Sequence, residues 1–265
     1  MTEEAQKLED GRLEGLELNN YPWFHERHRI FPGIFKKGRY KKILDTAAGV
    51  GVVAKRIQDN YDCFMLCNDI SEQALKSLIK NNLTTVSFDL DDPDVSFPFP
   101  DETFDAIISL ATLEHIINLD KHIAEIWRLL KYDGHLYIST PNYSSIHFLI
   151  PFILNGRTFH NPLKEGIPKY EFYAHVRYFT YKTLLDFISF FGFQPEKVYL
   201  PLPKGSTKFL ALKERSKLQA YIIRTLIYLF YLIMTPRWAF HPVLCFSKVH
   251  HQASKKHKKP KKVIL

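Results

Sequence analysis

Residues 42–53 have the pattern of a short apolar strand that ends on a carboxylate and turns through small residues into a helix. They read Lys-Ile-Leu-Asp-Thr-Ala-Ala-Gly-Val-Gly-Val-Val. Small residues in such a turn let the backbone approach a ligand closely, and Asp45 can accept hydrogen bonds from that ligand. The phosphate-binding pattern Gly-x-Gly-x-x-Gly is absent, because Ala47 replaces its first glycine, and a carboxylate here would repel a pyrophosphate. We therefore expect a cationic, phosphate-free nucleoside cofactor, and S-adenosyl-L-methionine has this chemistry.

Carboxylates also follow the next two apolar runs of the chain. Asp69 comes shortly after residues 64–67, and Asp89 comes directly after residues 85–88. The carboxyl ends of parallel strands lie at one edge of a sheet, and ligands bind beyond that edge. Asp45, Asp69 and Asp89 are therefore expected to face one ligand site.

The apolar periodicity predicts an α/β fold with a doubly wound parallel sheet. Seven strands are expected, at residues 42–45, 64–67, 85–88, 105–110, 136–139, 195–200 and 243–249. Helices are expected at 52–59, after an N-cap at Ser71, and from an N-cap at Asp120 to a C-cap at Gly134. Strands that alternate with helices form a parallel sheet, and the last two strands are expected to close it as an antiparallel hairpin.

Five segments occur in the order found in one enzyme family. They are Asp-Thr-Ala-Ala-Gly-Val-Gly at 45–51, Asp69, Phe-Asp-Leu at 88–90, and the runs 97–116 and 125–142. With them the chain resembles the class I S-adenosylmethionine-dependent methyltransferases over residues 21–193. Residues 175–180, His-Val-Arg-Tyr-Phe-Thr, are similar to relatives that act on small molecules, lipids and glycans.

The resemblance implies a seven-stranded Rossmann-like sheet that binds S-adenosyl-L-methionine. It places the two ribose hydroxyls on Asp69 and the adenine amine near Asp89. The cofactor-binding residues that it implies are Asp45, Ala47, Gly49, Gly51, Asp69, Ile70, Asp89, Leu90 and Leu110. Ala47 departs from the family's glycine, and if that position needs a positive φ, alanine costs roughly 1 kcal/mol. A relative that binds the cofactor without catalysis is therefore an alternative.

Two histidines are candidates for a general base. The cofactor carries the reactive methyl group, and the protein aligns a nucleophile within about 3–3.5 Å of it. An oxygen or nitrogen acceptor can need a base to take its proton, and histidine often serves. His115 follows the fourth strand and His175 precedes the helix capped by Thr180, so both are placed near the site; a packing role is the alternative for each. No metal is expected.

The chain divides into four parts. These are cap helices at 1–35, a methyltransferase core at 36–203 with a substrate-cap insertion at 143–176, an apolar helical insert with the last strand at 204–249, and a basic tail at 250–265 that is expected to be disordered. The apolar run 221–234 is too short to span a bilayer, because Arg224 leaves only ten uninterrupted residues after it. Contact with a membrane surface through 218–240 and 255–262 is one reading of the insert and tail; burial or dimerisation is the other.

The net charge of +8 belongs mainly to the tail. Six lysines between residues 255 and 262 supply most of it, which leaves only +2 for the rest. A nearly neutral body without an RNA-binding module makes nucleic acid an improbable partner. Three cysteines in apolar settings predict neither a disulfide framework nor a zinc site, and favour the cytoplasm, with peripheral attachment to a membrane as an option.

Three functions compete at this point. The leading one is methyl transfer to an oxygen or nitrogen atom of a small acceptor, amphipathic or lipid-linked, such as a quinone precursor or a lipid-linked glycan. The alternatives are an RNA methyltransferase that uses the lysine-rich tail, and a non-catalytic cofactor-binding protein on the same fold.

Overall fold

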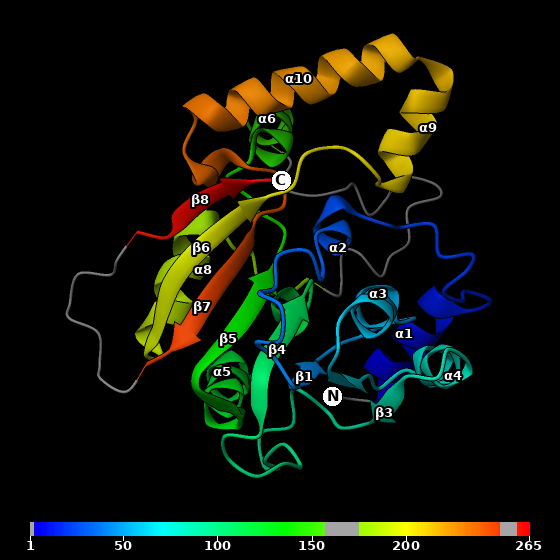
Figure 1. Cartoon of the computed structure of the whole chain (residues 1–265), viewed down its shortest axis with the longest axis vertical. Helices are drawn as coiled ribbons and strands as arrows, with labels where there is room; N and C mark the ends of the chain where they lie inside the picture. Colours follow the sequence, from blue (N-terminus) through cyan, green and yellow to red (C-terminus); the bar gives the residue numbers. More distant parts are fainter. Residues whose placement is uncertain (1–2, 157–174, 250–258) are drawn as a thin grey trace.

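The computed structural model describes residues 3–156, 175–249 and 259–265 of the 265-residue chain. Eight strands in these ranges form one sheet in the order β3-β2-β1-β4-β5-β7-β6-β8 (Figure 1). The strands are β1 Lys42–Asp45, β2 Phe64–Asn68, β3 Thr84–Val86, β4 Phe104–Leu110, β5 Leu130–Ser139, β6 Phe193–Leu200, β7 Val243–Lys248 and β8 Lys261–Ile264. β7 runs antiparallel to β5 and β6, and the other neighbouring strands are parallel. The predicted doubly wound sheet with a terminal antiparallel hairpin is confirmed.

Helices connect these strands and extend beyond them. They are α1 Glu3–Leu13, α2 Glu26–Arg29, α3 Val52–Asn60, α4 Glu72–Lys80, α5 Leu119–Leu129, α6 Ile146–Asn155, α8 Tyr181–Phe190, α9 Thr207–Arg215 and α10 Lys217–Ile233, with 3-10 turns η1 Leu113–His115 and η2 Pro236–Trp238. Among the described helices, none combines the length and the apolar character that crossing a membrane requires.

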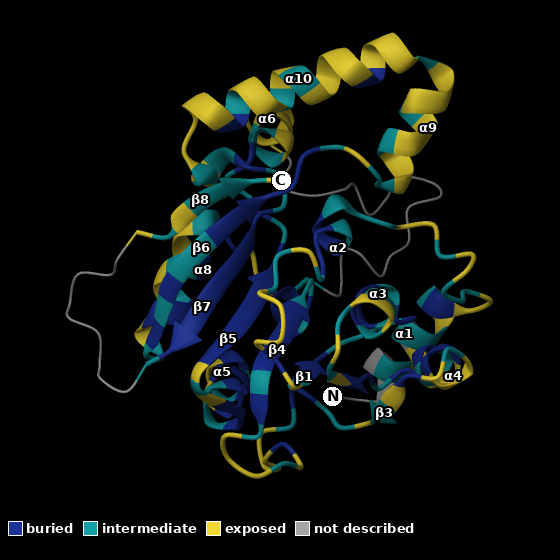
Figure 2. Ribbon diagram, in the orientation of Figure 1, coloured by how far each residue is buried: buried dark blue, intermediate teal, exposed yellow. Residues whose placement is uncertain are grey.

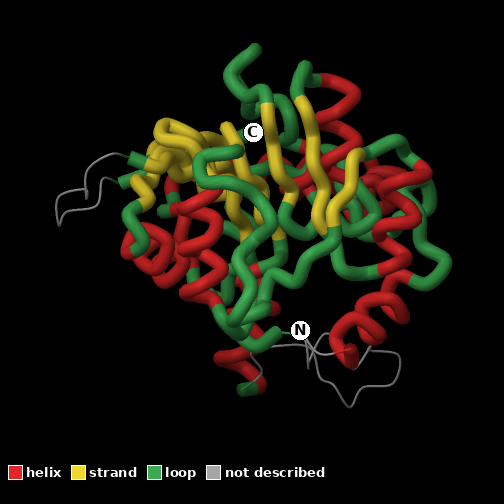
Figure 3. Tube along the Cα trace, turned by 90° about the horizontal axis from the view of Figure 1, so that it is seen from below, coloured by secondary structure: helices red, strands yellow, loops and turns green. Residues whose placement is uncertain are grey.

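The central strands β1, β4, β5 and β7 are buried and mostly dark in Figure 2, whereas the edge strands β3 and β8 are intermediate or exposed. Helices lie on both sides of the sheet in Figure 3. Neighbouring strand residues alternate between two apolar cores, as the two-residue period of a strand requires. Leu44 and Ile107 belong to the core under α5 and α8, whereas Ile43 and Ile108 belong to the core under α3.

The eighth strand corrects two expectations, the seven-stranded sheet and the disordered tail at 250–265. Lys261–Ile264 pairs with β6 in parallel, from Lys197 opposite Lys261 to Leu200 opposite Ile264. Val263 and Ile264 pack against the two cores on opposite faces, which gives this lysine-rich segment the alternation of a strand. Residues 250–258 lie outside the described part of the chain.

Gly134 and Asp120 play other roles than predicted. α5 ends at Leu129 and its N-cap is Asn118, so Asp120 falls in its first turn. Gly134 lies inside β5, where a Cβ would stand 2.7 Å from the carbonyl oxygen of Lys131. Close packing of the backbone, rather than the end of a helix, requires glycine at this position.

Three helices lie beyond the carboxyl ends of the parallel strands. Figure 1 shows α6, α9 and α10 at that end of the molecule. α6 falls in the insertion predicted at 143–176, whose residues 157–174 lie outside the described ranges. α10 contains the apolar run predicted at 221–234.

Candidate functional site

Two buried carboxylates stand side by side where β1 and β2 end. Asp45 is the last residue of β1 and is 4% exposed, and Asp69 follows β2 and is 9% exposed. Burial raises the pKa of Asp45 to about 7, with the Ala47 amide opposing and the charge of Asp69 adding to the rise. Burial likewise raises the pKa of Asp69 to about 6. Both carboxylates would gain from a ligand that brings hydrogen-bond donors or positive charge.

The loop after β1 leaves space next to Asp69. The amides of Gly49 and Ser71 donate to the two oxygens of Asp69, at 2.8 and 3.0 Å. Gly49 has a φ of +55°, and a Cβ built on it would meet no atom within 4 Å. A ligand can therefore reach the backbone at Gly49 and the carboxylate of Asp69 together.

Gly51 is needed for packing. It caps α3 with a φ of +93°, and a Cβ there would lie 2.8 Å from Leu83 Cδ1 and 3.0 Å from Leu78 Cδ2. Ala47 is not among the described non-glycine residues with a positive φ. The backbone strain considered for Ala47 is therefore absent.

Asn68 was missed by the sequence analysis, although it joins three segments of the site. Its amide nitrogen donates to the carbonyls of Thr46 and Phe88, at 2.9 and 3.2 Å, and its Oδ1 accepts from the Phe88 amide at 2.9 Å. The side chain is almost fully buried. Asn68 thus holds the ends of β1 and β2 against the loop that follows β3.

The other predicted cofactor residues border the same edge of the sheet. β3 ends at Val86, so Asp89 lies in the following loop, where its Oδ1 accepts from the Asp91 amide at 2.8 Å. Leu90 is buried in the core, and Leu110 is the last residue of β4. The carbonyl of Ile70 accepts from Gln6 of α1 at 3.1 Å, so the N-terminal helix packs beside Asp69.

The structure brings the two candidate bases together. The rings of His115 in η1 and His175 before α8 lie edge to face with centroids 4.8 Å apart. Burial, and then the neighbouring His115, lower the pKa of His175 to about 4, so this imidazole is neutral at pH 7. The Tyr143 hydroxyl lies 3.4 Å from His175 Nδ1.

Glu114, next to these histidines, and Arg27 are both buried, and the charge of Arg27 acts on Glu114. Glu114 is 1% exposed, its pKa is raised by burial to about 7, and its Oε2 has no hydrogen-bond partner among the described residues. The buried guanidinium of Arg27, from α2, opposes that rise. The sequence analysis missed Arg27, because no periodicity links α2 to the turn after β4; the aromatic and basic composition around it was the one available signal.

Two groups of side chains in the described ranges could hold a metal ion. The ligand atoms of Glu114, His115 and His175 all lie within 4.8 Å of one another. His135, Glu196 and Cys245 form the other group, but the Arg39 guanidinium lies 3.2 Å from His135 Nε2 and disfavours a cation there. The expectation that no metal is used stays a prediction, and the first group is where it can be tested.

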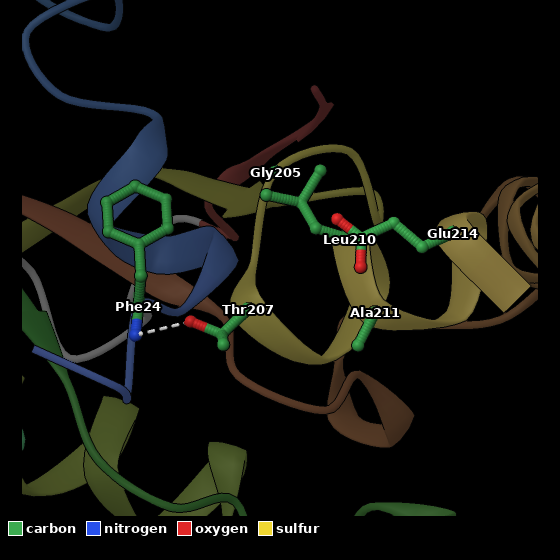
Figure 4. A pocket seen from close by; sticks show the side chains of 6 residues that line it. All are labelled: Phe24, Gly205, Thr207, Leu210, Ala211 and Glu214. Atoms are coloured by element: carbon green, nitrogen blue, oxygen red, sulfur yellow. Dashed lines mark hydrogen bonds between the residues drawn. The ribbon is translucent and has the colours of Figure 1, made fainter. Parts of the chain in front are cut away.

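A pocket of about 460 Å³ lies away from these residues (Figure 4). It is lined by Phe24, Gly205, Thr207, Leu210, Ala211 and Glu214. The Phe24 amide donates to Thr207 Oγ1 at 3.2 Å, which joins α9 to the segment before α2. None of the predicted cofactor residues lines this pocket, so we do not assign it to the cofactor.

Comparison with known proteins identifies the part of the chain that carries the carboxylates. A family model described as a methyltransferase domain matches residues 44–138. Residues 44–138 form a class I S-adenosylmethionine-dependent methyltransferase domain. His115 lies within this methyltransferase domain, and His175 lies outside it. The cofactor of the domain is S-adenosyl-L-methionine.

Known proteins similar to the methyltransferase domain differ in their reported activities. The chain is 32% identical over 91 residues to arginine-hydroxylase NDUFAF5, mitochondrial, of Rattus norvegicus, a match that covers 34% of this chain and 26% of that protein. It is 31% identical over 112 residues to malonyl-acyl-carrier protein O-methyltransferase of Geobacter sulfurreducens, covering 40% of this chain and 41% of that protein. The matches thus span about a quarter to two-fifths of these relatives.

The fold is also shared with a solved methyltransferase. Phosphoethanolamine N-methyltransferase 2 of Haemonchus contortus, in complex with S-adenosyl-L-methionine, superposes with a TM-score of 0.52 at 19% identity, covering 84% of this chain and 51% of that chain. At this identity the likeness concerns the fold of the methyltransferase domain alone.

The donor and acceptor groups of the site fit the cofactor. Each oxygen of Asp69 accepts one backbone amide and retains a lone pair, which suits two neighbouring ribose hydroxyls. Asp45 and Asp69 are both buried, and their carboxylates are close enough to repel each other. The positive charge of a sulfonium or ammonium group would offset this repulsion.

Proposed function

We propose that this chain is a methyltransferase that moves a methyl group from S-adenosyl-L-methionine to an oxygen or nitrogen atom of a small, amphipathic acceptor. The observation that carries the proposal is the contact between His115 and His175 beside the methyltransferase domain, with a neutral His175. The bound cofactor would supply an electrophilic methyl on a sulfonium.

The residues that would hold the cofactor surround the ends of β1, β2 and β3. Asp69 would accept from the ribose hydroxyls, and Asp89 from the adenine amine. The open backbone at Gly49 would let the cofactor lie against the loop. Asn68 would act indirectly, by fixing the positions of these segments.

The histidines would remove the proton of the acceptor. Its pKa of about 4 leaves His175 unprotonated at neutral pH but makes the ring a weak base, so His175 would take a proton efficiently only if the bound acceptor raised this pKa toward the working pH. Tyr143 contacts Nδ1 and would hold the ring in place. Glu114, with an oxygen within 4.8 Å of a ring nitrogen of each histidine, would stabilise the protonated ring by its charge.

The acceptor is proposed to be amphipathic because apolar helices lie at the same end of the molecule as the site. α6 and α10 carry exposed apolar residues, and both helices lie beyond the carboxyl ends of the parallel strands (Figure 1). The relative from Geobacter sulfurreducens is named for methyl transfer to an oxygen of malonyl-acyl carrier protein, which supports an oxygen atom as the acceptor on this kind of domain.

Calorimetric titration of S-adenosyl-L-methionine and S-adenosyl-L-homocysteine into the wild type and Asp69→Ala tests the cofactor site. We expect binding that weakens by roughly 1–3 kcal/mol in the variant, because the diol loses its acceptor. Release of S-adenosyl-L-homocysteine in the presence of membrane extracts then tests turnover. Binding without turnover on any fraction would support the non-catalytic alternative, and no binding to the wild type would reject the proposed function.

A further inference from the structure

The exposed side chains of α10 are mainly apolar. The most exposed of them are Leu218, Tyr221, Leu226, Leu229, Leu232 and Ile233, which are 47–79% exposed. The second half of α6 adds Ile150, Phe152, Ile153 and Leu154. We call the exposed apolar residues of α6 and α10 the apolar face; both helices are largely yellow in Figure 2. So many exposed large apolar side chains on two helices at one end of the molecule favour an interaction site there.

α10 uses one narrow stripe to pack on the protein. Ala220 and Tyr231 are buried, and they lie three helical turns apart on one side of the helix. Ile227 and Phe230 are partly buried next to Tyr231. The remaining circumference is available to a partner.

The charged residues of the segment that contains α10 are almost all basic. Residues 204–240 contain seven lysine and arginine residues and one acidic residue, Glu214. Arg215, Lys217, Arg224 and Arg237 are among the basic residues, and all seven are exposed. This charge complements an anionic surface and opposes the approach of a second copy of the same segment.

Aromatic side chains occur where the apolar and basic residues meet. Tyr221 and Tyr228 are exposed on α10, and the guanidinium of Arg237 lies 5.6 Å from the ring centre of Trp238 in η2. Amphipathic rings beside basic residues are typical of helices that lie in the boundary between lipid headgroups and acyl chains.

The C-terminal end of α10 is held firmly against the body of the protein. Lys262 of β8 donates through Nζ to the carbonyls of Tyr231, Leu232 and Met234, at 2.7, 3.1 and 3.3 Å. This lysine falls in the segment 255–262 that was predicted to touch a membrane, and it instead caps the helix.

A second anchor connects the apolar face to the site. The side-chain nitrogen of Asn142 donates to the carbonyls of Arg237 and Ala239, at 2.9 and 2.7 Å. The next residue, Tyr143, contacts His175. The apolar face is thus fixed relative to the candidate catalytic residues.

We infer that the apolar face binds in the plane of an anionic lipid bilayer, with the site held above the headgroups. The described helices are too short to span, so α10 lies along the surface. The inference rests on the proposed function in one respect: the membrane would supply the amphipathic acceptor.

Flotation of the full chain with vesicles tests the inference. One vesicle contains phosphatidylcholine alone, and the other also contains phosphatidylglycerol. We expect flotation with the anionic vesicles, weakened by salt and reduced about tenfold or more by the double variant Leu229→Glu/Ile233→Glu. The matched control is Ile79→Glu, an exposed apolar side chain of α4, which should float like the wild type.

Three results would overturn the inference. They are failure of the wild type to float with anionic vesicles, equal flotation of the α10 variant, and a dimer in light scattering that the α10 variant abolishes. Cofactor titration of every variant separates the two proposals. If the wild type binds the cofactor but does not float, only the membrane inference is rejected. If the wild type floats but does not bind the cofactor, only the proposed function is rejected.

Discussion

His115 and His175 meet edge to face although 59 residues separate them in the chain. Their contact depends on backbone hydrogen bonds rather than on the rings, because the amides of Val176 and Arg177 donate to the carbonyl of Glu114 at 2.9 and 3.2 Å. The turn after β4 and the segment before α8 are therefore joined at the place where an acceptor would lose its proton.

Replacing either histidine should slow turnover and leave cofactor binding intact. For the residue that acts as the base, His115→Gln or His175→Gln is expected to lower kcat by about 10²–10⁴-fold. The double variant should lose little more than the worse single variant, because the two rings act together. Steady-state kinetics and cofactor titration measure both effects. The exposed His147 offers a control, His147→Gln, and unchanged kcat in both single variants would exclude a base at this pair.

Chelation should leave the activity unchanged. We predict that the histidines act as bases without a metal, so turnover after treatment with EDTA should match that of the untreated protein. The ligand atoms of Glu114, His115 and His175 are close enough to bind an ion, which makes the experiment informative. Activity that is lost on chelation and restored by one divalent cation, together with loss of bound metal in Glu114→Gln, would assign this group to a metal instead.

The pKa of Asp69 should appear in the pH dependence of both binding and stability. The folded-state pKa is about 6, above its ordinary value of 3.8, so the ionised carboxyl destabilises the cofactor-free protein increasingly as pH rises from 3.8 to 6 and fully above 6. The free energy of unfolding of the wild type should therefore fall by roughly 1–3 kcal/mol between pH 4 and pH 8 relative to that of Asp69→Asn, whose side-chain NH2 cannot accept from a backbone amide and so lowers the variant's stability at every pH.

Cofactor affinity should follow the opposite course. Below about pH 6 the Asp69 carboxyl gains a proton and loses part of its capacity to accept from the ribose, so affinity should fall by at most about tenfold per pH unit. Asp62→Asn is a suitable control, since the Asp62 side chain is 97% exposed. Denaturant unfolding and calorimetry over this pH range would contradict the prediction if Asp69→Asn and Asp62→Asn behaved alike.

Alanine substitutions at two glycines of the loop after β1 should have different effects on stability and on cofactor binding. Gly49→Ala places a methyl group in open space at a φ of +55°, which should cost about 1 kcal/mol of stability and weaken cofactor binding. Gly51→Ala drives a Cβ into Leu83 and Leu78, which should cost about 2 kcal/mol or more of stability, and because that Cβ points into the core it should weaken cofactor binding by the folded fraction less than Gly49→Ala does. Thermal unfolding and titration of both variants test this contrast, and equal losses of affinity would refute it.

Local patterns were sufficient to predict that Asp45 and Asp69 lie at the ends of two strands. Asp45 ends one apolar run and Asp69 follows another, and small residues come after Asp45. Such apolar runs and turn residues can be recognised in the sequence without any tertiary information. The same reasoning named both His115 and His175, but not their contact, because nothing local brings the insertion back to the turn after β4.

The features that were missed depend on tertiary contacts. Asn68 matters because three segments converge on its amide, and Arg27 matters because Glu114 is buried nearby. The error at Gly134 has a similar origin, since the approach of the Lys131 carbonyl becomes visible only when β5 is in place. A glycine in a sequence marks a constraint without saying whether a helix end or a neighbouring backbone imposes it.

The pairing of β8 with β6 has a consequence for any truncated form of this chain. Residues 261–264 occupy the hydrogen-bonding edge of β6, and the amide of Leu202 donates to the carbonyl of Leu265 at 2.6 Å. Removing residues 255–265 to eliminate lysines would also uncover an unpaired edge, and such an edge recruits strands from other molecules. Insolubility of the shortened protein would then result from the exposed edge of β6 and not from the loss of charge. The role of the tail's charge is therefore better examined by replacing the lysines at 255–259 with glutamine.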